Sequence, residues 1–174
     1  MSNDLGAWRD ELLQCVKAGT FPPRPAHLFT VQPVLIVAGA CRNESGEPWR
    51  QFIKTLEDKL STFAGRVISG GTCVGVCAEV GRISAETSKE KRKWISVGYL
   101  PGRTSPDWID KRYDEFIFTD GNTFSEMEPL QYWTDILASG ISPEQVFFLR
   151  YGGSKLSDFE EDLMNEIGLP RNAL

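Results

Sequence analysis

The chain has 174 residues, 41% of them hydrophobic and 25% charged, with a net charge of −5 and a pI of about 5.0. This length predicts one domain with a sizeable core. The acidic balance makes nucleic acid an unlikely main partner, because nucleic-acid-binding domains usually carry a basic stripe. No apolar run approaches the roughly 20 residues that span a bilayer, and the N-terminal sequence lacks the pattern of a signal peptide. We therefore expect a cytoplasmic protein without a membrane partner.

The four cysteines do not have the spacing of a zinc site. Cys73 and Cys77 are separated by three residues, no second pair follows them, and His27 is the only histidine. Cys15 and Cys41 lie farther away in the sequence. A structural zinc would lack ligands, so buried free thiols are favoured over metal or redox chemistry. We expect neither a metal nor a cofactor.

Residues 5–17 have the periodicity of an amphipathic helix. Its apolar face would consist of Leu5, Trp8, Leu12 and Val16. The Pro-rich segment 21–27 then ends the helix and forms an extended arm. We therefore expect an N-terminal helix and arm over residues 1–28, followed by a domain over residues 29–174 that is a candidate module of a longer protein. Trp8 and Phe21 would either pack in the core or form contacts in an assembly.

Beyond the arm, short β-branched runs alternate with helical periodicities. In chain order we expect a strand at 33–40, a helix at 47–65, a strand at 66–71, a helix at 75–89, strands at 93–100 and 113–120, a helix at 123–140, a strand at 144–153 and a helix at 155–168. Gly65 is the expected C-terminal stop of the helix before it, and Thr123 with Glu126 forms a capping-box pattern. The alternation predicts a Rossmann-like, doubly wound α/β fold with a mostly parallel sheet of about five to seven strands.

Glycine-rich turns follow four of the five expected strands. In a parallel sheet these turns meet at the carboxyl edge, where ligands of doubly wound folds bind. The second turn, SGGTCVG at residues 69–75, leads directly into a helix. The N–H groups and partial positive charge of a helix N-terminus favour an anion. The turn is neither a Walker loop nor the dinucleotide fingerprint, so it is either a different phosphate cradle or a plain connection.

Two segments together resemble the SLOG superfamily. They are VLIVAGACRNESGEPW at residues 34–49 and, one helix later, GRVISGGTCVGVCAEVGRIS at residues 65–84. Ser69-Gly70-Gly71-Thr72 with Gly75-Val76 is similar to the glycine turn of that superfamily, and the resemblance covers roughly residues 30–168. The group includes the LOG phosphoribohydrolases that activate cytokinins, the N-terminal nucleotide-sensing domain of melastatin-type TRP channels, and sensors of bacterial antiphage systems such as Thoeris.

The resemblance implies which residues would contact a nucleotide-derived ligand. The first ligand loop would consist of Gly39, Ala40, Cys41, Arg42 and Asn43. The phosphate turn would consist of Ser69, Gly70, Gly71, Thr72, Gly75 and Val76. The base or ribose side would be lined by Gly98, Tyr99 and Leu100, and the site would be closed by Gly152, Gly153, Ser154 and Glu160. Two of these assignments have alternatives, because Arg42 would either bind phosphate or remain solvated, and Tyr99 would either stack on a base or pack internally.

The departures from the catalytic LOG pattern decide which activity the resemblance implies. Those enzymes carry PGGxGTxxE, whereas this chain has YGGSKLSDFEE, without the proline and the Gly-Thr pair. Glu160 and Glu161 stand at a different spacing from the glycines, and Arg103 and Arg150 are candidates for the arginine that the enzymes carry upstream. We therefore lean away from an enzyme and expect a sensor of an ADP-ribose-like or cyclic nucleotide signal, as in bacterial antiphage signalling.

Two alternative functions remain open. One is an N-glycosidic phosphoribohydrolase that uses Glu160 or Glu161 on a nucleoside monophosphate or an NAD-like substrate. The other is an assembly domain whose N-terminal helix and arm mediate contacts. The expected partners are a small nucleotide-derived ligand and either a homodimer, a higher oligomer or a fused effector domain.

Overall fold

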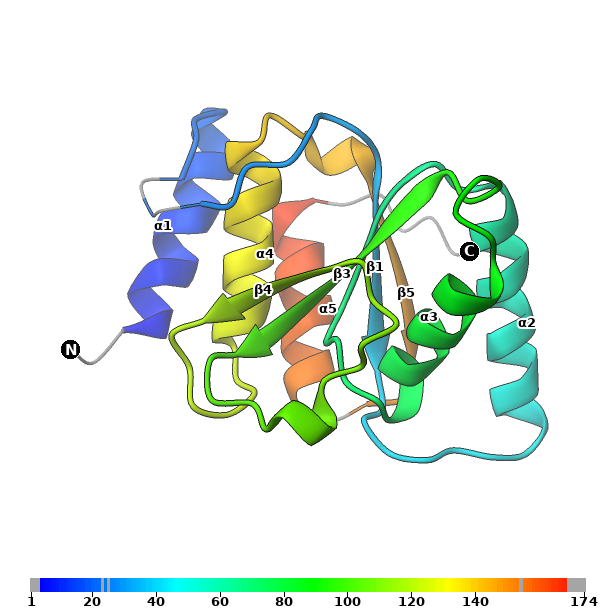
Figure 1. The fold of residues 1–174 in the computed structure, drawn as a ribbon. Helices are drawn as coiled ribbons and strands as arrows, with labels where there is room; N and C mark the ends of the chain where they lie inside the picture. Colours follow the sequence, from blue (N-terminus) through cyan, green and yellow to red (C-terminus); the bar gives the residue numbers. More distant parts are fainter. Residues whose placement is uncertain (1–3, 23, 25, 154, 169–174) are drawn as a thin grey trace.

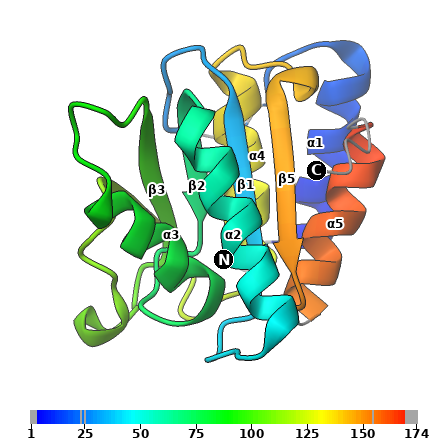
Figure 2. The same ribbon diagram turned by 90° about the vertical axis from the view of Figure 1, so that its right-hand side faces the viewer.

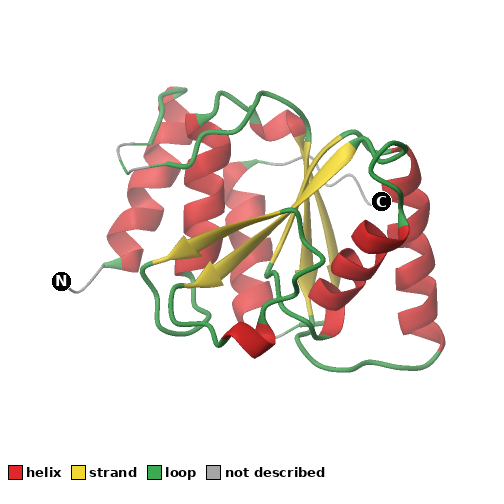
Figure 3. Ribbon diagram, in the orientation of Figure 1, coloured by secondary structure: helices red, strands yellow, loops and turns green. Residues whose placement is uncertain are grey.

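The computed structural model describes residues 4–22, 24, 26–153 and 155–168. Its centre is a sheet of five strands, all parallel, in the order β4-β3-β2-β1-β5 (Figures 1 and 3). The strands are β1 (Val34–Gly39), β2 (Gly65–Ser69), β3 (Trp94–Pro101), β4 (Glu115–Thr119) and β5 (Val146–Tyr151). The expected doubly wound α/β fold with a parallel sheet is confirmed.

Helices cover both faces of this sheet (Figure 2). One face carries α2 (Glu47–Thr62) and α3 (Gly75–Glu86), and the other carries α1 (Leu5–Ala18), α4 (Met127–Ala138) and α5 (Lys155–Ile167). Alternate residues of β1 explain the two layers, because Leu35 and Val37 pack toward α2 and α3 while Val34 and Ile36 pack toward the other layer. The successive side chains of a strand point to opposite faces, so this continuous apolar run fills two separate cores.

The strand order places a topological switch point between β1 and β5. From β1 the chain builds outward through β2 and β3 to β4, and then α4 returns it across the opposite face to β5. The register of the β1–β5 pair runs from Val34 opposite Val146 to Gly39 opposite Tyr151. The connections that leave these two strands therefore diverge, and doubly wound sheets bind ligands in the resulting crevice.

The connection between β3 and β4 contains no α-helix. It consists of residues 102–114, with a single 3-10 turn, η1 (Pro106–Trp108), although the two strands are parallel neighbours. A second 3-10 turn, η2 (Pro143–Gln145), precedes β5. The β3–β4 connection is important for the site because it returns across the glycine turn after β2.

The N-terminal helix α1 packs on α4 and α5. Trp8 and Leu12 are buried, and the indole Nε1 of Trp8 donates a hydrogen bond to Thr134 Oγ1 at 3.2 Å. Phe21, in the following arm, is 66% exposed. Trp8 is therefore a core residue, whereas Phe21 presents an apolar side chain at the surface.

Two of the expected helix boundaries were wrong. Gly65 does not stop α2, which ends at Thr62, but begins β2 with a φ of +150° because its α-carbon lies against the Pro33 carbonyl. Thr123 does not cap α4, which begins at Met127. There the Ser125 N–H donates to the buried Glu128 carboxylate at 2.8 Å, so a side chain inside the first turn satisfies the helix start. Among the described residues, no helix is long and apolar enough to cross a membrane.

Candidate functional site

A cavity of about 70 Å³ opens at the carboxyl edge of the sheet, beside the switch point. It is bounded by the ends of β1 and β2, by β3, by the loop before α4, and by the N-terminal halves of α3, α4 and α5. Its lining residues are Ile36, Val37, Gly39, Cys41, Ile68, Ser69, Gly70, Cys77, Tyr99, Phe124, Glu128, Pro129, Tyr132, Leu156, Ser157 and Glu160. A volume of this size holds a few water molecules, so it accepts one group of a larger ligand that lies across its mouth.

Several glycines at this edge allow close contacts within the protein itself. A Cβ on Gly39 would lie 2.2 Å from the Tyr151 carbonyl oxygen, and one on Gly75 would lie 1.9 Å from the Ala40 carbonyl oxygen. Gly75 also has a φ of +59°, which a side chain would strain. These two glycines therefore join the ends of β1, β5 and α3 tightly, and this packing forms the wall of the cavity.

Gly71 and Gly98 make a third close approach. A Cβ on Gly71 would lie 2.9 Å from the Gly98 α-carbon, so the turn after β2 rests directly on β3. Gly98, Tyr99 and Leu100 belong to β3, which continues to Pro101 instead of ending at a glycine turn. The residues expected to form the third glycine turn therefore belong to strand β3. Gly98 allows the backbone of the turn after β2 to lie close to β3.

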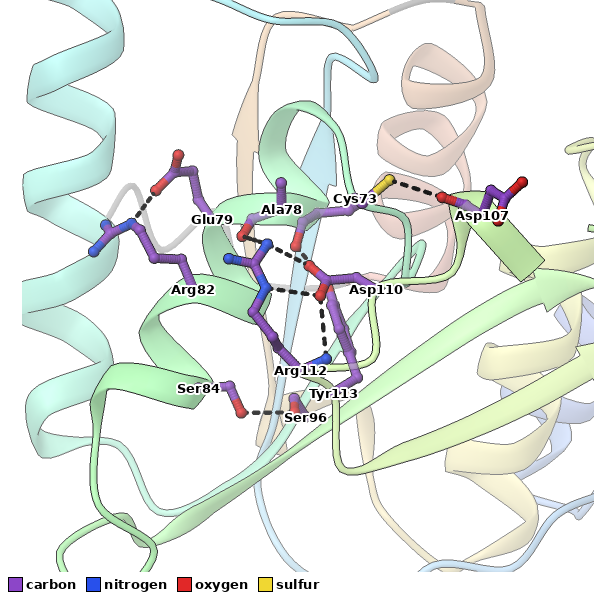
Figure 4. Close-up of polar contacts among 11 residues, drawn as sticks. Cys73, Ala78, Glu79, Arg82, Ser84, Ser96, Asp107, Asp110, Arg112 and Tyr113 are labelled. Atoms are coloured by element: carbon purple, nitrogen blue, oxygen red, sulfur yellow. Dashed lines mark hydrogen bonds and ion pairs between the residues drawn. The ribbon is translucent and has the colours of Figure 1, made fainter. Parts of the chain in front are cut away.

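The β3–β4 connection covers one side of the expected phosphate turn. The Asp110 N–H donates to the Gly71 carbonyl at 2.9 Å, and the Cys73 N–H donates to the Trp108 carbonyl at 3.0 Å. Figure 4 shows how Asp110 is held in turn by the Arg112 guanidinium, with Nε to Oδ1 at 2.8 Å. The turn is therefore fastened from outside, and its open side faces the cavity through Ser69 and Gly70.

The other residues of that turn do not line the cavity. Thr72 is 2% exposed, and its hydroxyl has no hydrogen-bond partner among the described residues. The Val76 N–H already donates to the Ala40 carbonyl at 3.0 Å. A phosphate held by the Thr72 hydroxyl and the Val76 N–H would require these groups to rearrange.

An acidic wall faces the cavity from α4 and α5. The Tyr132 hydroxyl donates to Glu160 Oε1 at 3.2 Å. Burial raises the pKa of Glu160 to about 7, against a partial lowering by that hydrogen bond. Glu128 is 4% exposed and accepts from the Thr119 hydroxyl at 2.5 Å, and burial raises its pKa as well. Two carboxyl groups in an apolar setting offer strong acceptors to a ligand that carries hydroxyl or amino groups.

Tyr99 is not available to stack on a base. Its ring is 1% exposed and packs edge-on against Tyr132, with centroids 5.7 Å apart. Its hydroxyl donates to Asp135 Oδ2 at 2.6 Å. Of the two alternatives considered for Tyr99, internal packing is the one observed. The aromatic ring at the cavity that does reach the surface is Phe124, which is 39% exposed.

The candidate basic residues lie outside the cavity. Arg42 is exposed and its Nε donates to Glu44 at 2.6 Å, so it belongs to the loop beside the cavity mouth. Arg150 donates to Asp158 at 2.5 Å and also pairs with Glu161. Glu161 therefore points to a surface ion pair, whereas Glu160, one residue earlier, lines the cavity.

The turn after β5 contributes backbone to the same edge. Gly152 and Gly153 are exposed and have φ values of +55° and +121°. A Cβ on Gly153 would lie 2.4 Å from the Ser157 side chain, so this turn also packs tightly onto α5. Ser154 lies outside the described residues. Asn43 and Ala40 belong to the β1–α2 loop, and neither lines the cavity.

Sequence reasoning missed the contribution of α4. Glu128 and Tyr132 are four residues apart on α4, a spacing that places them on one face, and Phe124 lies in the loop just before this helix. The sequence shows that face but does not show which strand ends it covers. Ser157 and Leu156 from α5 were missed as site residues for the same reason.

Comparisons with solved structures identify neighbours of this fold. One is the molybdenum cofactor carrier protein from Chlamydomonas reinhardtii, with a TM-score of 0.54 and 19% identity over 80% of this chain and 74% of that chain. Another is the molybdenum cofactor binding protein from the phototrophic bacterium Rippkaea orientalis, with a TM-score of 0.56 and 15% identity over the same shares. No protein-family model and no curated protein matches the sequence. At identities this low, the structural similarity shows a shared Rossmann-like fold alone.

Proposed function

We propose that this chain is a SLOG-type domain that binds a small nucleotide-derived ligand of the ADP-ribose or cyclic nucleotide class. The observation that carries the proposal is the cavity at the β1–β5 switch point, walled by the carboxyl groups of Glu128 and Glu160. In this proposal a ribose hydroxyl pair or an amino group enters the cavity and donates to these carboxylates. The fold neighbours are named for a bound cofactor, which supports a small-ligand role for this architecture.

The charge distribution suggests how such a ligand would be oriented. The described cavity lining contains no lysine or arginine, so a phosphate would not enter it beside two carboxylates. The phosphates would lie outside the mouth, near Arg42 and the backbone of Gly152 and Gly153 at the start of α5. Phe124 is the exposed aromatic that a base could contact.

Calorimetry with ADP-ribose, its cyclic isomers, NAD and AMP tests this proposal. We expect saturable binding of at least one of them, and a loss of affinity of 10-fold or more in Glu160→Gln, on the order of one hydrogen bond to a charged group. Glu161→Gln is the matched control, because its side chain points to Arg150 and not to the cavity. Absence of binding at millimolar concentration would contradict the proposal, and so would equal losses in the two variants.

A second variant tests the location without changing charge. A Cβ on Gly70 would lie 3.1 Å from Cys77 Sγ and 3.6 Å from the Phe124 ring, inside the cavity. Gly70→Val should therefore fill the cavity and abolish binding while the protein stays folded, which circular dichroism would establish. Unchanged affinity in a folded Gly70→Val protein would place the ligand elsewhere.

One observation favours turnover as a second candidate function. A carboxyl group whose pKa is about 7 is partly protonated at neutral pH, which suits a general acid at a glycosidic bond. N-glycosidic hydrolysis of a nucleoside monophosphate or NAD would release free base, which chromatography detects. We expect any such release to disappear in Glu160→Gln and to persist in Glu161→Gln. Binding without base release would assign the chain to sensing alone.

The proposal also includes the setting that the resemblance implies. The domain would act in antiphage signalling, either as a homo-oligomer or beside a fused effector domain, and its location would be the cytoplasm that the sequence pattern favours. Light scattering of the full chain with and without the bound nucleotide measures whether the chain forms a homo-oligomer. A monomer under both conditions would exclude the homo-oligomer.

A further inference from the structure

Two cysteines that are distant in the sequence meet at the cavity. Cys41 follows β1 and Cys77 lies in the first turn of α3, and both side chains line the cavity. The backbone explains the meeting, because the Val76 N–H donates to the Ala40 carbonyl at 3.0 Å and the next residue on each side is a cysteine. Gly75 permits this contact, since any side chain there would collide with the Ala40 carbonyl.

The two thiols differ in their surroundings. The Cys41 thiol donates to the Gly39 carbonyl at 3.8 Å, and Cys77 Sγ accepts from the Ser69 hydroxyl at 3.3 Å. Cys41 is exposed and Cys77 is buried. The nearer cysteine in sequence, Cys73, is exposed, and its Sγ lies 3.5 Å from the Asp107 carbonyl in the β3–β4 connection (Figure 4). The spacing of Cys73 and Cys77 in the sequence thus points to the wrong partner.

Several groups stabilise a negative charge on Cys77. The nearby Cys41 thiol and the Ser69 and Thr72 hydroxyls lower the pKa of Cys77 to about 6, against the effect of burial. The Ser69 hydroxyl donates to Cys77 Sγ at 3.3 Å. The Thr72 hydroxyl is buried close by and has no hydrogen-bond partner among the described residues. Cys77 also lies in the first turn of a helix, where the dipole favours a thiolate. The neighbouring Cys77 and burial raise the pKa of Cys41, and Glu160 adds to this effect.

We propose that Cys41 and Cys77 are a thiol–disulfide redox pair that is oxidised by a low-molecular-weight disulfide such as oxidised glutathione. The oxidant reaches the exposed Cys41. The Cys41 sulfur attacks one sulfur of the oxidant, the oxidant's S–S bond breaks, and the Cys41 proton passes to the departing thiolate, which leaves as a thiol. The product is a mixed disulfide on Cys41 beside the Cys77 thiolate.

The second step closes the protein disulfide. The Cys77 thiolate attacks the Cys41 sulfur, so the mixed disulfide breaks, its outer sulfur leaves as a thiolate, and the Cys41–Cys77 bond forms. Two electrons pass to the oxidant, which leaves as two thiols, one of them in its ionised form. The new bond ties the β1–α2 loop to α3 at the cavity, so the redox state would control the first ligand loop.

Peptide mapping of the full chain tests the pair directly. The protein is equilibrated in buffers of reduced and oxidised glutathione, quenched with acid and alkylated in denaturant. Trypsin places Cys41 in peptide 18–42 and both Cys73 and Cys77 in peptide 67–82. We expect a crosslink between these two peptides that dithiothreitol reverses, with Cys15 still alkylated.

Matched variants assign the crosslink to individual residues. Cys73→Ser should keep it, because Cys73 lies outside the pair, and Cys41→Ser should lose it. The proposal is overturned if both peptides remain fully alkylated in the most oxidising buffer while the protein is folded. It is equally overturned if Cys73→Ser removes the crosslink. None of these outcomes depends on a nucleotide, so they are independent of the proposed ligand-binding function.

Discussion

Replacing Glu160 with glutamine measures how much the carboxyl group in the cavity lowers the free energy of unfolding. Glutamine has nearly the same shape, and its carbonyl oxygen can still accept the hydrogen bond from Tyr132. What the substitution removes is the negative charge. Burial raises the pKa of Glu160 from an ordinary 4.5 to about 7 in the folded protein.

The sign of the effect follows from proton linkage. Because the folded state holds this proton more tightly than the unfolded state, the stability of the wild-type protein falls as pH rises from about 4.5 to about 7. The full difference between these two pKa values corresponds to about 3 kcal/mol at pH 8. Since Glu160 is only half-buried, we take this as an upper bound and expect Glu160→Gln to be more stable by about 2 kcal/mol. At pH 4 the two proteins should be equally stable.

Urea unfolding at pH 4, 6 and 8 measures this difference. Glu161→Gln serves as the control, because Glu161 is an exposed partner of Arg150 and its removal should change stability by less than about 1 kcal/mol. A stability gain in Glu160→Gln that is the same at all three pH values would refute the reasoning. A gain confined to high pH would show that the ionised Glu160 carboxylate destabilises the folded protein.

Three further substitutions, the first with Gly19→Ala as its control, test the packing of the fold. Gly75→Ala places a Cβ 1.9 Å from a backbone carbonyl oxygen and should prevent stable folding, whereas Gly19→Ala, also at positive φ but with open space, should cost only about 1 kcal/mol by thermal denaturation. Tyr99→Phe leaves the buried Asp135 without one donor, so unfolding free energy should drop by about 1–3 kcal/mol, and an unchanged value would show that the bond is dispensable. Trp8→Ala should cost about 3–5 kcal/mol if α1 is part of the core, and a negligible loss would make α1 an accessory element.

The sequence by itself determined the architecture. Apolar runs of four to six residues alternate with amphipathic helices, and this pattern suits only a parallel sheet covered on both faces. Leu35 and Ile36 illustrate the point, since adjacent apolar residues in one strand need a core on each side. Helix and strand boundaries were accurate to a few residues because local capping and turn residues set them. Two residues gave wrong boundaries. Gly65 makes a close contact with the Pro33 carbonyl instead of ending a helix, and Thr123 lies before α4 without capping it.

Only the tertiary structure decided the composition of the site. Carboxyl-edge glycines were evident from the sequence, yet Gly39, Gly71 and Gly75 bring protein backbones together, and which backbones approach each other depends on strand order. The side chains that fill the cavity from α4, Glu128 among them, depend on how the return from β4 crosses the sheet.

The cysteines show the same division. Spacing in the sequence pairs Cys77 with Cys73, but a helix begins between them and Cys73 Sγ lies near the Asp107 carbonyl in the β3–β4 connection. Cys41 reaches Cys77 because a strand end and a helix start, 36 residues apart along the chain, share one backbone hydrogen bond between Ala40 and Val76. Local patterns determine local structure, whereas contacts between distant segments arise only when the sheet is assembled.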